Sequence, residues 1–147
     1  MKLIIQRVSS GSVVVNNQTI GSIGSGYVVL VGIKVGDTKT QADKLAEKLL
    51  NLRIMSDKSN HMNLSILDTK GELLLISQFT LYADTKGRRP GFTQAMPPQQ
   101  AKQLFDYFVD KISKSGLKVE TGEFGAMMDV SLTNSGPVTI TLEESAY

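Results

Sequence analysis

The chain has 147 residues, of which 41% are hydrophobic and 20% charged, and its formal net charge is +2. These values predict one globular domain over residues 1–147 and exclude a chain that is mostly disordered. The net charge alone does not indicate a surface that binds nucleic acid. The sequence has no cysteine, which excludes disulfides, thiolate catalysis and zinc–sulfur sites.

The N-terminal third has the composition of β-strands. β-branched residues dominate residues 3–8, 13–15 and 27–33, and Asn16-Asn17 marks a turn. The unbroken apolar run at 28–31 predicts a strand that is covered on both faces.

The glycine-rich segment 21–26 resembles a phosphate-binding loop in composition. It lacks the P-loop lysine and is followed by a strand, so a hairpin connection is the favoured interpretation. The N-terminal residues contain no signal-peptide core, and no apolar run is long enough to cross a bilayer. We therefore expect a cytoplasmic protein without a membrane partner.

Two helices are expected. The first begins near Thr38, because Thr38 and Gln41 have the spacing of a capping box, and it ends near Leu52. The second begins at Pro98, which suits a first helical position, and Gly116 is a plausible terminating residue. Apolar residues recur at helical spacing in both segments.

Further strands are expected in the rest of the chain. The segment 72–81 (ELLLISQFTL) is apolar on both faces, which predicts a central strand after a turn at 68–71. A loop rich in glycine and charge follows at 82–96. The remaining predicted strands cover residues 53–56, 117–120, 127–133 and 138–142. The order of elements predicts a single α/β domain.

The usual catalytic side chains are scarce. His61 is the only histidine and lies in a polar stretch, where a solvated surface residue is the favoured interpretation. No group of histidines and carboxylates has metal-ligand spacing, so neither a metal nor another cofactor is expected. The basic cluster of Lys86, Arg88 and Arg89 is either a solvated face or a phosphate contact.

Two short motifs carry a resemblance to a known family. Ser77-Gln78-Phe79-Thr80-Leu81 ends an apolar strand, and Asn134-Ser135-Gly136-Pro137-Val138-Thr139 lies near the C-terminus. Each motif is weak alone, but together they resemble the D-aminoacyl-tRNA deacylase family over essentially the whole chain. Ser135 is a departure, because family members often have an acidic residue there. Other matching segments are Ile5–Val8, Met62-Asn63, Arg89-Pro90, Phe92 and Thr121–Met128.

The resemblance implies a fold, an assembly and a site. It implies mixed β-sheets with two main helices in α/β/β layers, dimerising through the sheet side. The homodimer's active sites would lie at the subunit interface, with Ser77, Gln78, Phe79 and Thr80 as catalytic residues. A cis Gly136-Pro137 bond of the partner subunit, fixed by Arg7, would select the chirality of the substrate. The chain also lacks the C-terminal extension that some animal relatives carry and that has been linked to DNA binding, so no DNA partner is expected.

The activity that the resemblance implies is hydrolysis of the ester of D-aminoacyl-tRNA. Backbone N–H groups of Phe79 and Thr80 are our candidates for stabilising the developing oxyanion. Either Thr80 attacks the ester, or the 2′-hydroxyl of the terminal adenosine assists a water; scarce side-chain catalysts favour the second scheme. Rejection of L side chains by a clash with Gly136-Pro137 would leave glycine accepted, including on tRNA(Ala). Lys86, Arg88 and Arg89 are candidate tRNA contacts, and a binding module without catalysis is the rival hypothesis.

Overall fold

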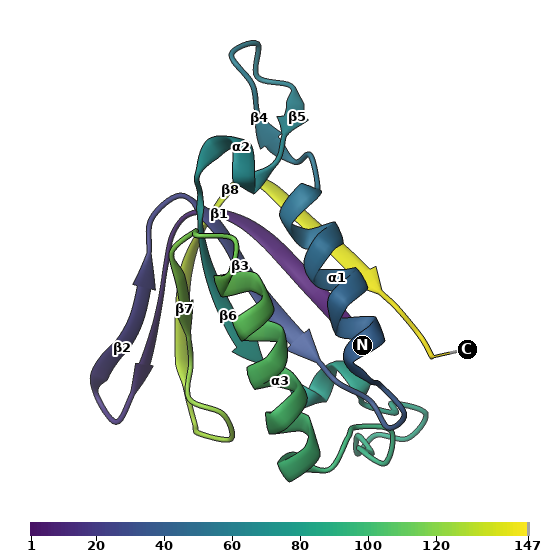
Figure 1. Ribbon diagram of the computed structural model, residues 1–147. Helices are drawn as coiled ribbons and strands as arrows, with labels where there is room; N and C mark the ends of the chain where they lie inside the picture. Colours follow the sequence, from purple (N-terminus) through teal and green to yellow (C-terminus); the bar gives the residue numbers. More distant parts are fainter. Residues whose placement is uncertain (147) are drawn as a thin grey trace.

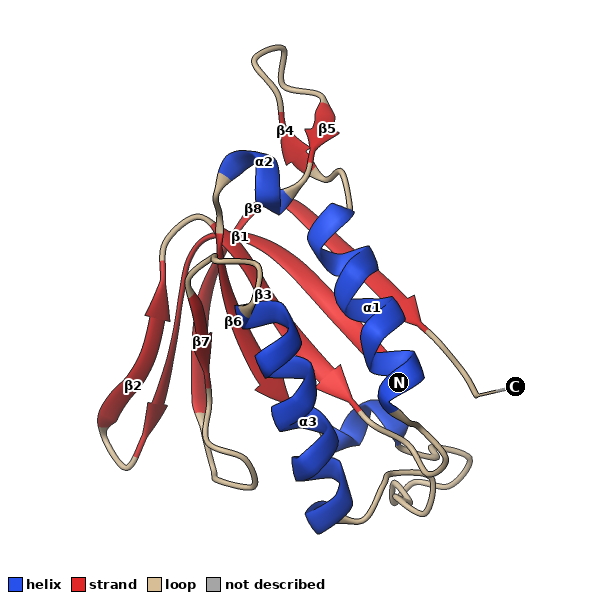
Figure 2. Ribbon diagram, in the orientation of Figure 1, coloured by secondary structure: helices blue, strands red, loops and turns tan. Residues whose placement is uncertain are grey.

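The computed structural model describes residues 1–146, which form a six-stranded sheet with helices on one face and a separate two-stranded sheet (Figures 1 and 2). Two long helices cover this face, as the sequence predicts, and two short helical segments accompany them. In chain order the elements are β1 (Lys2–Val15), β2 (Gln18–Ile23), β3 (Gly26–Gly32), α1 (Lys39–Asn51), β4 (Met55–Ser56), β5 (Met62–Leu64), α2 (Ile66–Thr69), β6 (Glu72–Ser77), the 3-10 helix η1 (Phe79–Tyr82), α3 (Pro98–Ser113), β7 (Val119–Thr121) and β8 (Asp129–Glu143).

The sheet is mixed and is organised around the long strand β1. Its strand order is β2-β1-β3-β6-β7, and β8 pairs along the other side of β1. The first half of β1 pairs antiparallel with β3 and the second half with β2, whereas β3, β6 and β7 run parallel. The parallel strands follow helical crossovers, which is the usual way to connect parallel neighbours.

The sheet curls until β2 approaches β7, so that it forms a partly closed barrel. A Cβ atom on Gly21 of β2 would lie 3.1 Å from the carbonyl oxygen of Thr121 in β7, which shows how closely the two strands pass. The curled sheet encloses a small apolar core of its own, and this gives the second β layer of an α/β/β arrangement. That core consists of Val8, Val13, Ile23, Val28, Leu74 and Ile76.

The main core lies between the sheet and helices α1 and α3. Leu45 and Leu49 of α1 and Phe108 of α3 are fully buried against fully buried residues of β1, β3 and β6. The predicted capping box of α1 is present, with Thr38 as N-cap and its backbone N–H donating to Gln41 Oε1 at 2.8 Å. Among the described residues, no helix has the length and apolarity needed to span a membrane.

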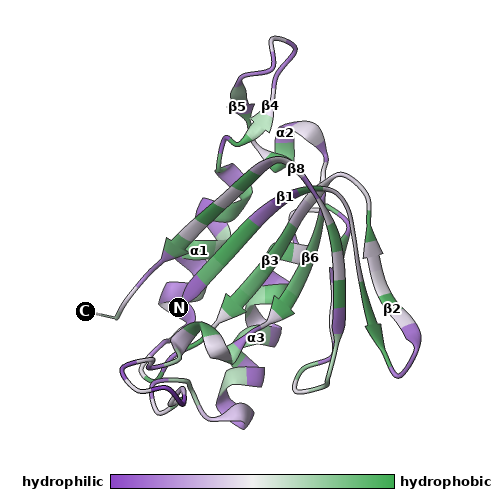
Figure 3. Cartoon of the chain, turned by 180° about the vertical axis from the view of Figure 1, so that it is seen from behind, coloured by the Kyte–Doolittle hydropathy of each residue, from purple (hydrophilic) through white to green (hydrophobic). Residues whose placement is uncertain are grey.

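Strand β8 forms an edge of the sheet. Figure 3 shows the face that carries no helix, where polar and apolar residues alternate along β8. The sequence predicts two strands separated by a turn at Gly136-Pro137, but the structure has one strand with register shifts against β1 at Gln6/Val8 and Val8/Ser10. The first shift absorbs extra residues of β8 and the second an extra residue of β1, so β8 bulges at Asn134–Pro137, which are exposed, and the pairing resumes beyond them.

Several other predictions need correction. The predicted strand 72–81 ends at Ser77, because its partner β3 ends at Gly32 and the chain then turns into η1. The segment 21–26 is no hairpin connection, since β2 and β3 pair with different halves of β1. The predicted turn at 68–71 is the end of the short helix α2, where Lys70 has a left-handed backbone. Strands β2 and β5 were not predicted, because β2 is mostly polar and β5 has only three residues in a polar stretch of sequence.

Candidate active site

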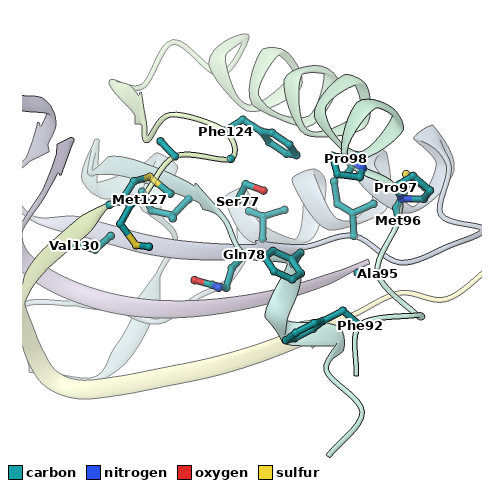
Figure 4. A pocket seen from close by; sticks show the side chains of 18 residues that line it. Ser77, Gln78, Phe92, Ala95, Met96, Pro97, Pro98, Phe124, Met127 and Val130 are labelled. Atoms are coloured by element: carbon teal, nitrogen blue, oxygen red, sulfur yellow. The ribbon is translucent and has the colours of Figure 1, made fainter. Parts of the chain in front are cut away.

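A cavity with a volume of about 640 Å³ opens beside the carboxyl ends of β3 and β6. Figure 4 shows Ser77 and Gln78 inside it, with apolar side chains from several loops around them. It is enclosed by the two strand ends, the start of η1, the loop before α3 and the loop between β7 and β8. The lining residues are Val31, Ile33, Ile76–Phe79, Phe92, Ala95–Pro98, Ala101, Phe124–Met128 and Val130.

The cavity wall is almost entirely apolar. Within the described part of the chain, every residue lining the cavity is apolar, apart from the hydroxyl of Ser77 and the amide of Gln78. General acid–base catalysis needs a positioned group such as a histidine or carboxylate. The protein therefore offers the cavity chiefly backbone groups, and chemistry in it must draw on those or on the substrate.

Backbone donors stand at the rim of the cavity where β6 passes into η1. The N–H of Gln78 makes the last sheet contact, donating to the carbonyl of Val31 at 2.8 Å, and the chain then turns. A short helix leaves its first N–H groups without partners inside the helix. Within residues 1–146, the backbone N–H groups of Phe79 and Thr80 have no hydrogen-bond acceptor, either in the backbone or in a side chain.

Packing fixes η1 on the sheet. A Cβ atom on Gly32 would lie 2.8 Å from Cβ of Leu81, so only glycine lets η1 pack this closely on β3. At the far end of η1, the buried Tyr82 hydroxyl donates to Glu143 Oε1 at 3.1 Å. Burial raises the pKa of Tyr82, which keeps the phenol protonated and able to donate. These contacts hold the donors of Phe79 and Thr80 in place.

The hydroxyl of Thr80 does not line the cavity. It accepts a hydrogen bond from Gln78 Nε2 at 2.5 Å, and no ionisable side chain of the described residues is hydrogen-bonded to it. A threonine hydroxyl needs an adjacent base to become a strong nucleophile. The geometry thus brings Ser77, Gln78 and Phe79 to the cavity and leaves Thr80 beside it.

The predicted basic cluster lies close to the cavity mouth. Asp84 and Gly91 pair with each other across the loop, and Lys86, Arg88 and Arg89 are exposed at its tip. Phe92, the residue after Gly91, packs edge-on against Phe79 with ring centroids 5.0 Å apart. The loop therefore carries positive charge beside an aromatic wall of the cavity.

The Gly136-Pro137 bond is cis, as the sequence-based prediction requires. Arg7 holds the segment before it, since Nε of Arg7 donates to the carbonyl of Ser135 at 2.9 Å. The Nη1 atom of Arg7 donates at 2.7 Å to the carbonyl of Ile54. Arg7 is thus a bridge between two segments that are far apart in the sequence.

The two motifs do not meet within one chain. Val8 of β1 lies opposite Asn134 in β8 and opposite Gly26 in β3. The cavity begins at Val31, five residues further along β3, and five residues of a strand span roughly 16 Å. None of residues 134–139 lines the cavity. A site that uses both motifs needs the second motif from another subunit.

Sequence reasoning missed most of the apolar wall. Met96 and Pro97 enter it from the loop before α3, and Phe124 and Met127 enter it from the loop after β7 (Figure 4). Met127 is 92% exposed, although methionine is a residue type that is most often buried. The only signal in the sequence was the cluster of apolar residues in two segments that otherwise have the composition of loops.

Fold and cavity together define a class: an α/β domain with an almost wholly apolar cavity and, where β6 passes into η1 at its rim, backbone N–H groups without an acceptor in residues 1–146. The family model described as D-Tyr-tRNA(Tyr) deacylase matches residues 4–143. A D-aminoacyl-tRNA deacylase of Bacillus licheniformis is 54% identical over 147 residues, covering 99% of this chain and all of that one. One from Aquifex aeolicus is 53% identical over 144 residues, covering 97% of each. The chain belongs to the D-aminoacyl-tRNA deacylase family and is a hydrolase of the ester bond of aminoacyl-tRNA.

Two solved structures are also similar. A structure titled "c-Myc DNA Unwinding Element Binding Protein" superposes with a TM-score of 0.94 at 41% identity, covering 99% of this chain and 100% of that one. A probable eukaryotic D-amino acid tRNA deacylase superposes with a TM-score of 0.86 at 18% identity, covering 96% and 97%. The second likeness supports the fold alone.

Proposed function

We propose that the chain acts as a cytoplasmic homodimer that hydrolyses D-aminoacyl-tRNA at sites shared between subunits. Ser77–Thr80 of one subunit would hold the ester, and Gly136-Pro137 of the other would reject L-amino acids. The observation that carries this proposal is a cavity with unpaired N–H donors and no ionisable lining residue within the described chain. The separation of the two motifs within one subunit is a second support.

The N–H groups of Phe79 and Thr80 would act as an oxyanion hole. Ester hydrolysis places negative charge on the former carbonyl oxygen in the transition state, and preorganised donors stabilise that charge. The apolar walls would exclude water from around the donors, which strengthens their interaction with the oxyanion. Loss of one such donor typically lowers kcat by roughly 10²–10³.

The 2′-hydroxyl of the terminal adenosine would assist the attacking water. This scheme takes the assisting group from the substrate, since no ionisable side chain of the described residues lines the cavity. The alternative scheme, nucleophilic attack by Thr80, would need a base near its hydroxyl, where the structure has the amide of Gln78. The measurement that separates the schemes is single-turnover hydrolysis by the Thr80→Ala variant and with a 2′-deoxyadenosine substrate. We expect substantial activity from the variant and none on the deoxy substrate; the reverse pattern would establish the threonine mechanism.

Chiral selection would rest on steric exclusion of L side chains rather than on specific binding of D side chains. The exposed backbone of Gly136 and Pro137, placed beside the substrate's α-carbon, would collide with an L side chain and leave a D side chain free. Each 1.4 kcal/mol of such a clash corresponds to about tenfold discrimination. Glycine has no side chain to reject, so the enzyme should also remove glycine from mischarged tRNA(Ala).

The tRNA would be held by phosphate contacts of Lys86, Arg88 and Arg89 beside the cavity mouth. Arginine and lysine contacts to phosphate weaken with salt, and a few contacts suffice to hold an acceptor end.

Incubation of the protein with D-tyrosyl-tRNA and L-tyrosyl-tRNA tests the whole proposal. We expect rapid loss of the D-ester alone. Loss of both esters would remove the role of Gly136-Pro137.

Binding of DNA, in addition to ester hydrolysis, is the second candidate. It is favoured by one observation, the similarity to a protein whose structure title names binding to a DNA unwinding element. It predicts salt-sensitive binding of a DNA fragment by the purified protein. No binding of the fragment at low salt would exclude this candidate.

A further inference from the structure

We infer that the projecting hairpin of residues 54–64 positions Gly136-Pro137 and thereby sets the D/L selectivity. This inference rests on the proposed role of Gly136-Pro137 in rejecting L-amino acids. The hairpin, formed by β4 and β5, extends from the body of the molecule at the end where Asn134–Pro137 lie (Figure 1). Its link to that segment is the side chain of Arg7.

Arg7 has contacts on two sides. On one side its Nε donates to the carbonyl of Ser135, next to Gly136. On the other side its Nη1 donates to the carbonyl of Ile54 at 2.7 Å and to Ser56 Oγ at 3.3 Å, where the hairpin begins. Two of the three acceptors therefore belong to the hairpin, so the direction of the guanidinium depends on where the hairpin stands.

The hairpin is braced internally, which allows it to act as a fixed support. Asp57 accepts from the N–H groups of Ser59 and His61 at 2.8 and 3.0 Å and from Asn63 Nδ2 at 3.2 Å. Arg53 reaches across from the end of α1, donating from Nε to the carbonyl of Asn63 at 2.7 Å and from Nη2 to its Oδ1. The side chain of Asn63 thus ties together the base and the tip of the hairpin.

The size of the strands explains why these polar bonds matter. Strands β4 and β5 have two and three residues, and among the hairpin residues only Ile54 and Met55 are buried. A hairpin this short has little apolar packing to fix it, and isolated two-stranded hairpins are marginally stable. Loss of the side-chain bonds should therefore loosen the hairpin, Arg7 and the Ser135–Pro137 segment in turn.

Asn63→Ala removes the central brace without touching the cavity, and Ser56→Ala removes one contact of Arg7. Lys58→Ala is the matched control, because Lys58 is exposed at the tip and makes no hydrogen bond or ion pair within the described chain. Two readouts are needed: the ratio of kcat/KM for D- and L-tyrosyl-tRNA, and amide hydrogen exchange of Asn134, Ser135 and Gly136 in the substrate-free protein.

We expect Asn63→Ala to lower the D/L ratio about fivefold, the factor that corresponds to loss of a typical hydrogen bond, mainly by raising kcat for the L-ester. Exchange at Ser135 and Gly136 should become faster, Ser56→Ala should have a smaller effect, and Lys58→Ala should have none. An unchanged ratio in Asn63→Ala would overturn the inference, as would a lowered ratio without faster exchange. An effect of Lys58→Ala on KM would point instead to a direct RNA contact of the hairpin and would also overturn it.

The failure of the proposed function would be visible separately. Wild-type protein that cleaves both esters equally would remove the role of Gly136-Pro137, whatever the variants do. The exchange measurement needs no substrate, so it would still decide whether the hairpin holds Ser135–Pro137 through Arg7.

Discussion

The Ser77–Tyr82 segment rests on the buried centre of the sheet, whereas Asn134–Pro137 bulge from its exposed edge. The first segment is fixed by close packing against β3, by the last sheet contact of Gln78 and by the buried hydroxyl of Tyr82. The second is held by edge pairing with β1 and by the side chain of Arg7. Rate should therefore depend on backbone groups in a rigid region, and selectivity on a few polar contacts in a looser one.

The largest expected effect comes from removing one backbone donor in the rigid segment. Phe79→Pro replaces an N–H that has no acceptor within the described chain, at the first position of a helix, where proline is tolerated. We expect kcat for D-tyrosyl-tRNA to fall roughly 10²–10³-fold with little change in melting temperature. Phe79→Leu, which keeps the N–H, is the control and should retain most activity. A Phe79→Pro enzyme within threefold of wild type would rule out this donor.

The next effect should appear in selectivity rather than in rate. Arg7→Ala removes all three hydrogen bonds that hold the exposed segment and the hairpin together. We expect the D/L ratio of kcat/KM to fall tenfold or more, which is about 1.4 kcal/mol of lost discrimination, while kcat for the D-ester changes little. Arg7→Lys keeps the charge but not the fork of donors and should give an intermediate ratio. Equal losses for the two esters would mean that Arg7 supports catalysis rather than chirality.

A smaller effect is expected for substrate binding at the cavity mouth. Combined replacement of Lys86, Arg88 and Arg89 by alanine should raise KM several-fold at low salt and make KM less dependent on salt. The double variant Lys102→Ala/Lys114→Ala removes two exposed, ion-paired lysines, one on α3 and one at its C-cap, and serves as the control. If both variants showed the wild-type salt dependence, the basic loop would have no contact with the tRNA backbone.

The smallest effect concerns pH and the hairpin alone. Hydrogen bonds from the backbone of His61 and Ser59 lower the pKa of Asp57 below its usual value of about 3.9. A lowered folded-state pKa gives stability that is present above the ordinary pKa and is lost as the pH falls through the folded-state pKa. NMR titration of the His61 and Ser59 amides should therefore show a midpoint below 3.9. A midpoint at or above that value would contradict the bracing by Asp57.

The sequence predicted the two long helices well because local rules determine them. The capping box of Thr38 and Gln41 and the proline at 98 lie where the helices begin. It predicted poorly where distant segments decide the conformation. Strand β6 ends at Ser77 because β3 ends beside it, and β8 continues through Gly136-Pro137 because β1 pairs with it on both sides.

In the candidate site, too, some features follow from local sequence and others only from contacts between distant segments. The motif Ser77–Thr80 could be found from the chain alone, but only the fold shows that Thr80 lies outside the cavity and that its hydroxyl accepts from Gln78. The apolar wall from Met96 to Met127 is assembled from separate loops, and no local pattern predicts it. The contacts of Arg7 with Ile54 and Ser135 join residues 47 and 128 positions apart.

The most direct test of the account is a mixed dimer of one Phe79→Pro chain and one Arg7→Ala chain, purified through two different tags. The only working oxyanion hole then belongs to the Arg7→Ala chain. If the partner subunit supplies the selecting segment, that site receives the intact segment of the Phe79→Pro chain. We predict that the mixed dimer hydrolyses D-tyrosyl-tRNA and still rejects L-tyrosyl-tRNA. Hydrolysis of the L-ester at the level of the Arg7→Ala homodimer would show that each subunit selects for itself, and would contradict the account.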